Sequence, residues 1–84
     1  MKQRRVLIVE PDCILAKAYA AALSDFVVQY VCTAAEAIAA ADAKQPDVVV
    51  LEPRLARNNG VEFLYECRSY GEWRDVPVIL ITSQ

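Results

Sequence analysis

The stretch Pro46-Asp47-Val48-Val49-Val50-Leu51-Glu52-Pro53 decides how the rest of this sequence is interpreted. Residues 48–51 are apolar without a polar interruption, which is typical of a strand buried on both faces of a parallel sheet. The run ends at Glu52, which a proline follows. Because open α/β sheets place their ligand sites beyond the carboxyl ends of their strands, Glu52 is a candidate functional residue. The alternative is a solvated acid that only closes the strand.

Three further stretches are predicted to form strands. Residues 6–9 and 78–81 are as apolar as residues 48–51, and all three are expected at the centre of the sheet. Residues 26–31 are rich in β-forming side chains but are interrupted by Gln29, which favours an edge position.

Helices are predicted after each of the first three strands. The first begins at Asp12, a suitable N-cap residue. The second begins with a capping box, in which Thr33 caps the helix and Glu36 reaches back, and it ends before Pro46. The third covers residues 61–69, after a polar loop.

The resulting order, β-α-β-α-β-α-β, predicts an α/β fold with a doubly wound parallel sheet, since crossovers between parallel strands are right-handed. One domain is expected to cover residues 1–84. The carboxyl ends of parallel strands meet at one edge of the sheet. Glu10, Glu52 and Thr82, which follow three of the strands, are therefore expected to lie together at that edge.

The composition argues against several classes of function. The 84 residues carry a net charge of −2 and no basic run beyond the first five residues, so no nucleic-acid partner is expected. Without histidine or a C-x-x-C pair, a zinc site has no support. Three cysteines stand isolated in the sequence and are expected to be small apolar core or half-buried residues in a reducing cytoplasm: Cys13, Cys32 and Cys67. No apolar run has transmembrane length, so no membrane partner is expected.

Four segments, taken in order, resemble those of one protein family. They are residues 6–12, 46–52, 59–60 and 73–83. The family is the receiver domain of two-component response regulators, which has the flavodoxin-like fold. The resemblance implies a role in a phosphorelay signalling system. It also implies that Glu52 occupies the phosphoacceptor position and that Thr82 is the switch residue.

The sequence departs from the family's pattern in its acidic pocket. In the family, two adjacent acids and the acceptor aspartate hold Mg²⁺, which requires oxygen ligands. Here Glu10 occupies the first acidic position, but Pro11 occupies the second and has no side-chain oxygen. Asp12 is also near the pocket, although we expect it to cap a helix. Glu10 and Glu52 are therefore only weak metal candidates, and neither Mg²⁺ nor another cofactor is expected.

The acceptor position is altered as well. Glu52 is one methylene longer than aspartate, which moves its carboxylate by about 1.5 Å and can reduce a rate about 10²-fold. The family's lysine follows a fifth strand that this sequence does not contain. We therefore expect a degenerate receiver that is not an enzyme and is not phosphorylated. Glu52 is then either the remnant of a lost site or a mimic of a phosphorylated aspartate that acts on Thr82.

The sequence stops after the fourth strand, whereas a complete receiver continues through a last α-β-α unit. Residues 78–81 would then form an apolar edge strand, which favours pairing with another chain. We expect self-association; the alternatives are a fragment of a longer protein and a partner that supplies the missing layer. The residues expected at the interface are Val78, Ile79, Leu80, Ile81 and Trp73.

The favoured function is a receiver-like module that signals through protein contacts without being phosphorylated. Two alternatives are a working phosphoacceptor receiver and a purely structural oligomerisation unit. The sequence does not distinguish a signalling partner from a second copy of the chain.

Overall fold

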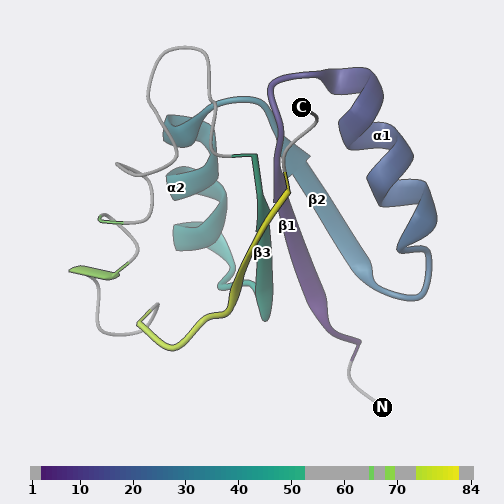
Figure 1. The fold of residues 1–84 in the computed structure, drawn as a ribbon. Coiled ribbons are helices and arrows are strands. Elements are labelled where there is room, and N and C mark those ends of the chain that lie inside the picture. The colour runs from purple at the N-terminus through teal and green to yellow at the C-terminus, as the bar shows by residue number, and fades with distance from the viewer. Residues whose placement is uncertain (1–2, 53–64, 66–67, 70–73, 82–84) are drawn as a thin grey trace.

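The computed structural model describes residues 3–52, 65, 68–69 and 74–81. Within them the chain forms one sheet with the strand order β2-β1-β3-β4, and every neighbouring pair is parallel. The elements are β1 (Arg5–Val9), α1 (Cys13–Ala22), β2 (Val27–Val31), α2 (Ala34–Ala43), β3 (Val48–Leu51) and β4 (Val78–Leu80). The predicted parallel, doubly wound α/β fold is therefore confirmed (Figure 1).

The predicted loop 53–60 and most of the predicted helix 61–69 lie outside the described residues, as do Cys67, Trp73 and Thr82. The described residues of that helix are helical. One of them, Arg68, donates hydrogen bonds from Nη1 to the carbonyl oxygens of Arg74 (2.8 Å) and Val76 (3.1 Å).

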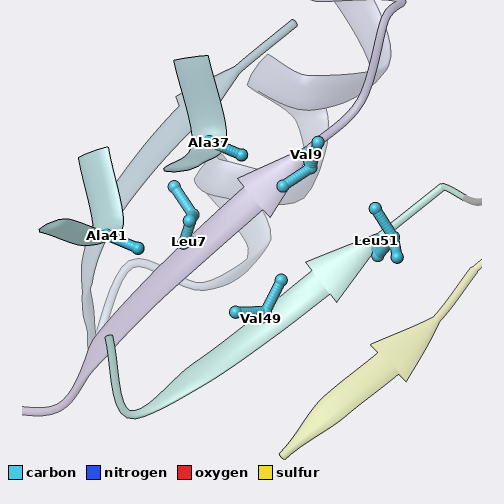
Figure 2. Close-up of a cluster of buried hydrophobic side chains, with 6 residues drawn as sticks. All are labelled: Leu7, Val9, Ala37, Ala41, Val49 and Leu51. Atoms are coloured by element: carbon cyan, nitrogen blue, oxygen red, sulfur yellow. The ribbon is translucent and has the colours of Figure 1, made fainter. Parts of the chain in front are cut away.

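The two helices cover opposite faces of the sheet (Figure 1). Successive side chains of a strand point to opposite faces, so each central strand supplies both layers of the core. Figure 2 shows the layer beneath α2, which consists of Leu7, Val9, Ala37, Ala41, Val49 and Leu51. The layer beneath α1 consists of Val6, Ile8, Ala16 and Val50.

Small residues on the helices allow this close packing. Ala16 of α1 and Ala37 of α2 are both 0% exposed. A methyl side chain lets the helix backbone approach the large side chains of the strands, because the core has the density of a crystal and leaves little free space. The fold therefore depends on alanine at these positions, although alanine itself contributes little apolar area.

The outer strands differ in how well the sequence predicted them. β2 lies at one end of the sheet, as expected from Gln29. For β4 the expected central position is wrong, whereas the other expectation, an apolar edge strand, is confirmed, since β4 ends the described strand order on the other side. Two of its apolar side chains are exposed, Ile79 by 51% and Leu80 by 57%. An apolar sequence alone could not distinguish a covered strand from an uncovered one.

The capping box of α2 is confirmed, with one difference. Thr33 Oγ1 accepts a hydrogen bond from the backbone N–H of Glu36 at 3.1 Å. Glu36 Oε1 in turn accepts from the backbone N–H of Cys32 at 3.0 Å, one residue before the cap. The helix ends at Ala43, before Pro46, as predicted. Among the described residues, no helix combines the length and apolar character needed to cross a membrane.

Substituting Ala16 by leucine should destabilise the protein by about 1–3 kcal/mol, because the larger side chain would be forced between α1 and the sheet. The matched control is Ala18→Leu on the same helix, since Ala18 is exposed and its substitution should change the free energy of unfolding by no more than about 0.5 kcal/mol. Urea denaturation measures both values. Equal losses of stability in the two variants would contradict the packing described here.

Candidate functional site

Two acids lie next to each other at the carboxyl edge of the sheet. Glu10 follows β1 and Glu52 follows β3, and the residues before them, Val9 and Leu51, are register partners. The backbone N–H of Glu52 donates to the carbonyl of Val9 at 2.9 Å. The predicted proximity of Glu10 and Glu52 is therefore confirmed, while Thr82 lies outside the described residues.

Both acids are buried. Glu10 is 3% exposed and Glu52 is 4% exposed, and they are the only buried charged side chains in the described part of the chain. The alternative that Glu52 is a solvated acid is therefore wrong. A buried carboxylate needs compensating hydrogen bonds, because its transfer from water is costly. No buried side-chain oxygen or nitrogen of the described residues lacks a hydrogen-bond partner, so this is a structured polar site within the fold.

Asp12 supports this site mainly through its backbone. Its N–H donates to Glu10 Oε2 at 3.0 Å. Its side chain is exposed, and Oδ1 accepts from the N–H groups of Ile14 (2.9 Å) and Leu15 (3.3 Å) at the start of α1. The predicted N-cap is therefore confirmed. The hydrogen bond to Glu10 was not predicted, because it depends on the turn around Pro11.

The site offers Mg²⁺ fewer acidic side chains than the family's pattern does. A Mg²⁺ ion requires near-octahedral coordination by oxygen, usually with at least one or two carboxylates. Pro11 offers no side-chain oxygen where the family has its second acid, and Asp12 Oδ1 is engaged by α1. No cluster of three or more cysteines or acids in the described ranges is placed to hold a metal ion.

Two cysteines lie beside this site, which the sequence reasoning missed. Cys13 is the first residue of α1 and Cys32 follows β2, and their sulfur atoms are 3.2 Å apart. The expected core or half-buried position is wrong for Cys13, which is exposed, and is confirmed for Cys32, which is half-buried. A signal was present in the sequence, since each cysteine comes shortly after the carboxyl end of a strand, and those two strands are neighbours.

The surroundings of Cys32 raise the pKa of its thiol above the ordinary value. The largest cause is its hydrogen bond with the Cys13 sulfur. Partial burial and the charge of Cys13 add to the effect, followed by the negative charges of Glu36 and Glu10. Each of these surroundings opposes deprotonation of the Cys32 thiol.

Comparison with known proteins places this arrangement in a family. The family model described as "Response regulator receiver domain" matches residues 6–84. No curated protein matches the sequence at a significant level.

Solved structures agree with this assignment. The chemotaxis response regulator CheY4 of Vibrio cholerae is 19% identical with a TM-score of 0.88, over 99% of this chain and 71% of that chain. The N-terminal domain of a response regulator receiver protein from Methanoculleus marisnigri is 21% identical with a TM-score of 0.91, and the match covers 99% of this chain and 69% of that chain. The non-phosphorylated HemR receiver domain of Leptospira biflexa is 27% identical with a TM-score of 0.86, and the match covers 98% of this chain and 66% of that chain.

These likenesses show the same fold, and the family match covers nearly the whole sequence. The buried acids at the ends of β1 and β3 occupy the edge of the sheet where the sequence resembles the acidic pocket and acceptor of that family. This chain belongs to the response regulator receiver domain family of two-component signalling.

Proposed function

We propose that this chain is a receiver-type signalling module that acts through protein contacts and does not form an acyl phosphate on Glu52. The observation that carries the proposal is the buried Glu52 at the position that the family gives to its acceptor aspartate. A phosphoacceptor must reach a donor molecule with its carboxylate in line for attack. The structure of the site opposes this in three ways.

The first is geometric. The backbone of Glu52 is fixed by its hydrogen bond to Val9, so the additional methylene displaces the carboxylate by about 1.5 Å relative to aspartate. Misplacement of about this size can cost about 10²-fold in rate. With 4% of its surface exposed, Glu52 also offers little access to a donor.

The second and third are electrostatic. A phosphoryl group on Glu52 would bring about two negative charges close to the buried carboxyl group of Glu10. Like charges at close range oppose each other strongly where water is excluded. In the family a cation offsets this repulsion, but Pro11 supplies no ligand for one. These three effects multiply in rate, so phosphorylation of Glu52 is strongly disfavoured.

Treatment with a small phosphodonor such as acetyl phosphate and Mg²⁺ should leave the intact mass of this protein unchanged. A receiver with an acceptor aspartate, treated in parallel, should gain the mass of one phosphoryl group, about 80 Da. The proposal fails if this chain gains the same mass and the Glu52→Gln variant does not. A gain that persists in Glu52→Gln would indicate another acceptor and would leave Glu52 unmodified, as proposed.

Millimolar Mg²⁺ should not change the Tm of this protein, because a ligand stabilises only a fold that binds it. The matched variant is Pro11→Asp combined with Glu52→Asp, which gives the site three acidic residues of the family's kind. Its Tm should rise when Mg²⁺ is added. Thermal unfolding with Mg²⁺ and with EDTA measures both, and a Mg²⁺-dependent rise in the unaltered protein would contradict the proposed loss of the metal site.

We further propose that the protein contact is made with a second copy of the chain through β4. Support comes from Ile79 and Leu80, whose exposure is unusual for large aliphatic residues in a strand. The strand lies at the end of the described sheet, where backbone groups can pair with another strand. A two-fold axis would place β4 against its own copy, and would cover the exposed side chains of both.

The oligomeric state is tested by light scattering over a range of concentrations. The unaltered protein should form a dimer, and Ile79→Lys should be monomeric because the lysine would be forced into the contact. The control is Val27→Lys in β2, since Val27 is 39% exposed and lies in the strand at the opposite end of the sheet. A dimer lost only in Val27→Lys, or a protein that is monomeric throughout, would exclude the β4 contact.

A further inference from the structure

The structure brings together two thiols that have no part in the proposed signalling function. Cys13 Sγ and Cys32 Sγ are 3.2 Å apart and 19 positions apart in sequence. A disulfide bond has an S–S distance of about 2.05 Å, so the two sulfurs need to approach by only about 1.2 Å. We propose that Cys13 and Cys32 form a reversible redox site, in which a small-molecule disulfide such as oxidised glutathione converts them into an intramolecular disulfide.

The proximity of the thiols is built into the fold. Cys13 follows β1 and Cys32 follows β2, and these strands pair in parallel up to Val9 and Val31. The N–H of Glu10 extends this pairing by donating to the carbonyl of Val31 at 3.0 Å. The sheet therefore fixes the starting points of the two segments that carry the sulfurs.

Local hydrogen bonds fix both segments further. The Asp12 cap holds the first turn of α1, where Cys13 is the first residue. Glu36 Oε1 accepts from the backbone N–H of Cys32 at 3.0 Å and holds the segment before α2. Neither cysteine belongs to a strand or to the buried core, so rotation of their side chains toward each other would leave the core packing in place.

The two sulfurs are suited to different steps. Cys13 is exposed and can reach a disulfide in solution, whereas Cys32 is half-buried. The hydrogen bond with Cys13 is the largest cause that raises the pKa of Cys32, which makes the Cys32 thiol harder to deprotonate than an ordinary thiol. Because Cys13 is the more accessible sulfur, it makes the first attack, and Cys32 is the resolving thiol.

The reaction balances as two successive exchanges. In the first, the Cys13 thiolate attacks one sulfur of glutathione disulfide, a mixed disulfide forms, and one glutathione thiolate leaves. Cys32 then releases its proton to solvent. In the second exchange its thiolate attacks the Cys13 sulfur and expels the second glutathione. The two protein thiols are oxidised by two electrons, and the glutathione disulfide is reduced to two thiols.

The resulting bond would join the two segments that border the buried acids. It would close a loop that contains all of α1 and β2. Cys13 directly follows Asp12, whose N–H holds the Glu10 carboxylate. Oxidation would thus stabilise this edge of the sheet, and a disulfide closing a loop of this size typically stabilises a small domain strongly.

The test uses the full chain in glutathione redox buffers, with Cys67→Ser as the background so that only two thiols remain. Oxidation should remove the mass of two hydrogen atoms and join the tryptic peptides 6–17 and 18–44. Dithiothreitol should reverse both changes. The Tm of the oxidised form should be higher by on the order of 10 °C. Cys32→Ser should stop at the mixed disulfide with glutathione, whereas Cys13→Ser lacks the attacking thiol and should form a mixed disulfide more slowly.

A second measurement separates a preorganised site from chance pairing. The equilibrium constant for disulfide formation should be at least about 10-fold larger in the folded protein than in urea, because only the fold holds the sulfurs together. The matched control, Cys13→Ser with Ile14→Cys, moves the thiol by one helical position and should lose most of this advantage. Equal constants in the folded and unfolded states would overturn the proposal, as would equal constants in the control and the Cys67→Ser background.

Discussion

The parallel pairing of β1 with β3 is the constraint on which the rest of this structure depends. It aligns Val9 with Leu51 and sets the hydrogen bond from the Glu52 N–H to the Val9 carbonyl at 2.9 Å. The same register places both acids at the edge of the sheet and directs alternate side chains to the cores under α1 and α2. A shift by one residue would exchange the two faces and separate the acids.

The buried carboxyl groups lie at the same edge of the sheet as the family's site, although the side chains around them differ from the family's pattern. Glu10 and Glu52 occupy the place where the family holds its metal and its phosphoryl group, and both are almost fully buried. The buried polar side-chain atoms of the described residues all have hydrogen-bond partners, and the backbone N–H of Asp12 donates to Glu10 Oε2. A proline in place of the second acid and a longer acid at the acceptor alter the ligands without altering the strands. The site and the sheet are therefore separable features of the sequence.

The same edge of the sheet explains the cysteine pair. Parallel strands bring together whatever follows their carboxyl ends, so β1 and β2 juxtapose Cys13 and Cys32 by the mechanism that β1 and β3 use for the acids. The pair and the acids are linked through Asp12, which caps α1 with its side chain and holds Glu10 with its backbone. A chemical change at the sulfurs would thus take place next to the buried carboxyl groups.

The sequence by itself determined the alternation of strands and helices, the caps at Asp12 and Thr33, and the strand-end positions of Glu10 and Glu52, because periodicity and capping are local properties of the chain. Only the tertiary structure decided what depends on neighbours. Glu52 is buried, although a solvated position would fit its sequence equally well. Ile79 and Leu80 are exposed, although their strand is as apolar as the strands of the core. The tertiary structure also placed Cys13 against Cys32, which are distant in sequence and look isolated there. Burial and contact between distant residues are set by strand order and helix placement, and a one-dimensional pattern does not contain them.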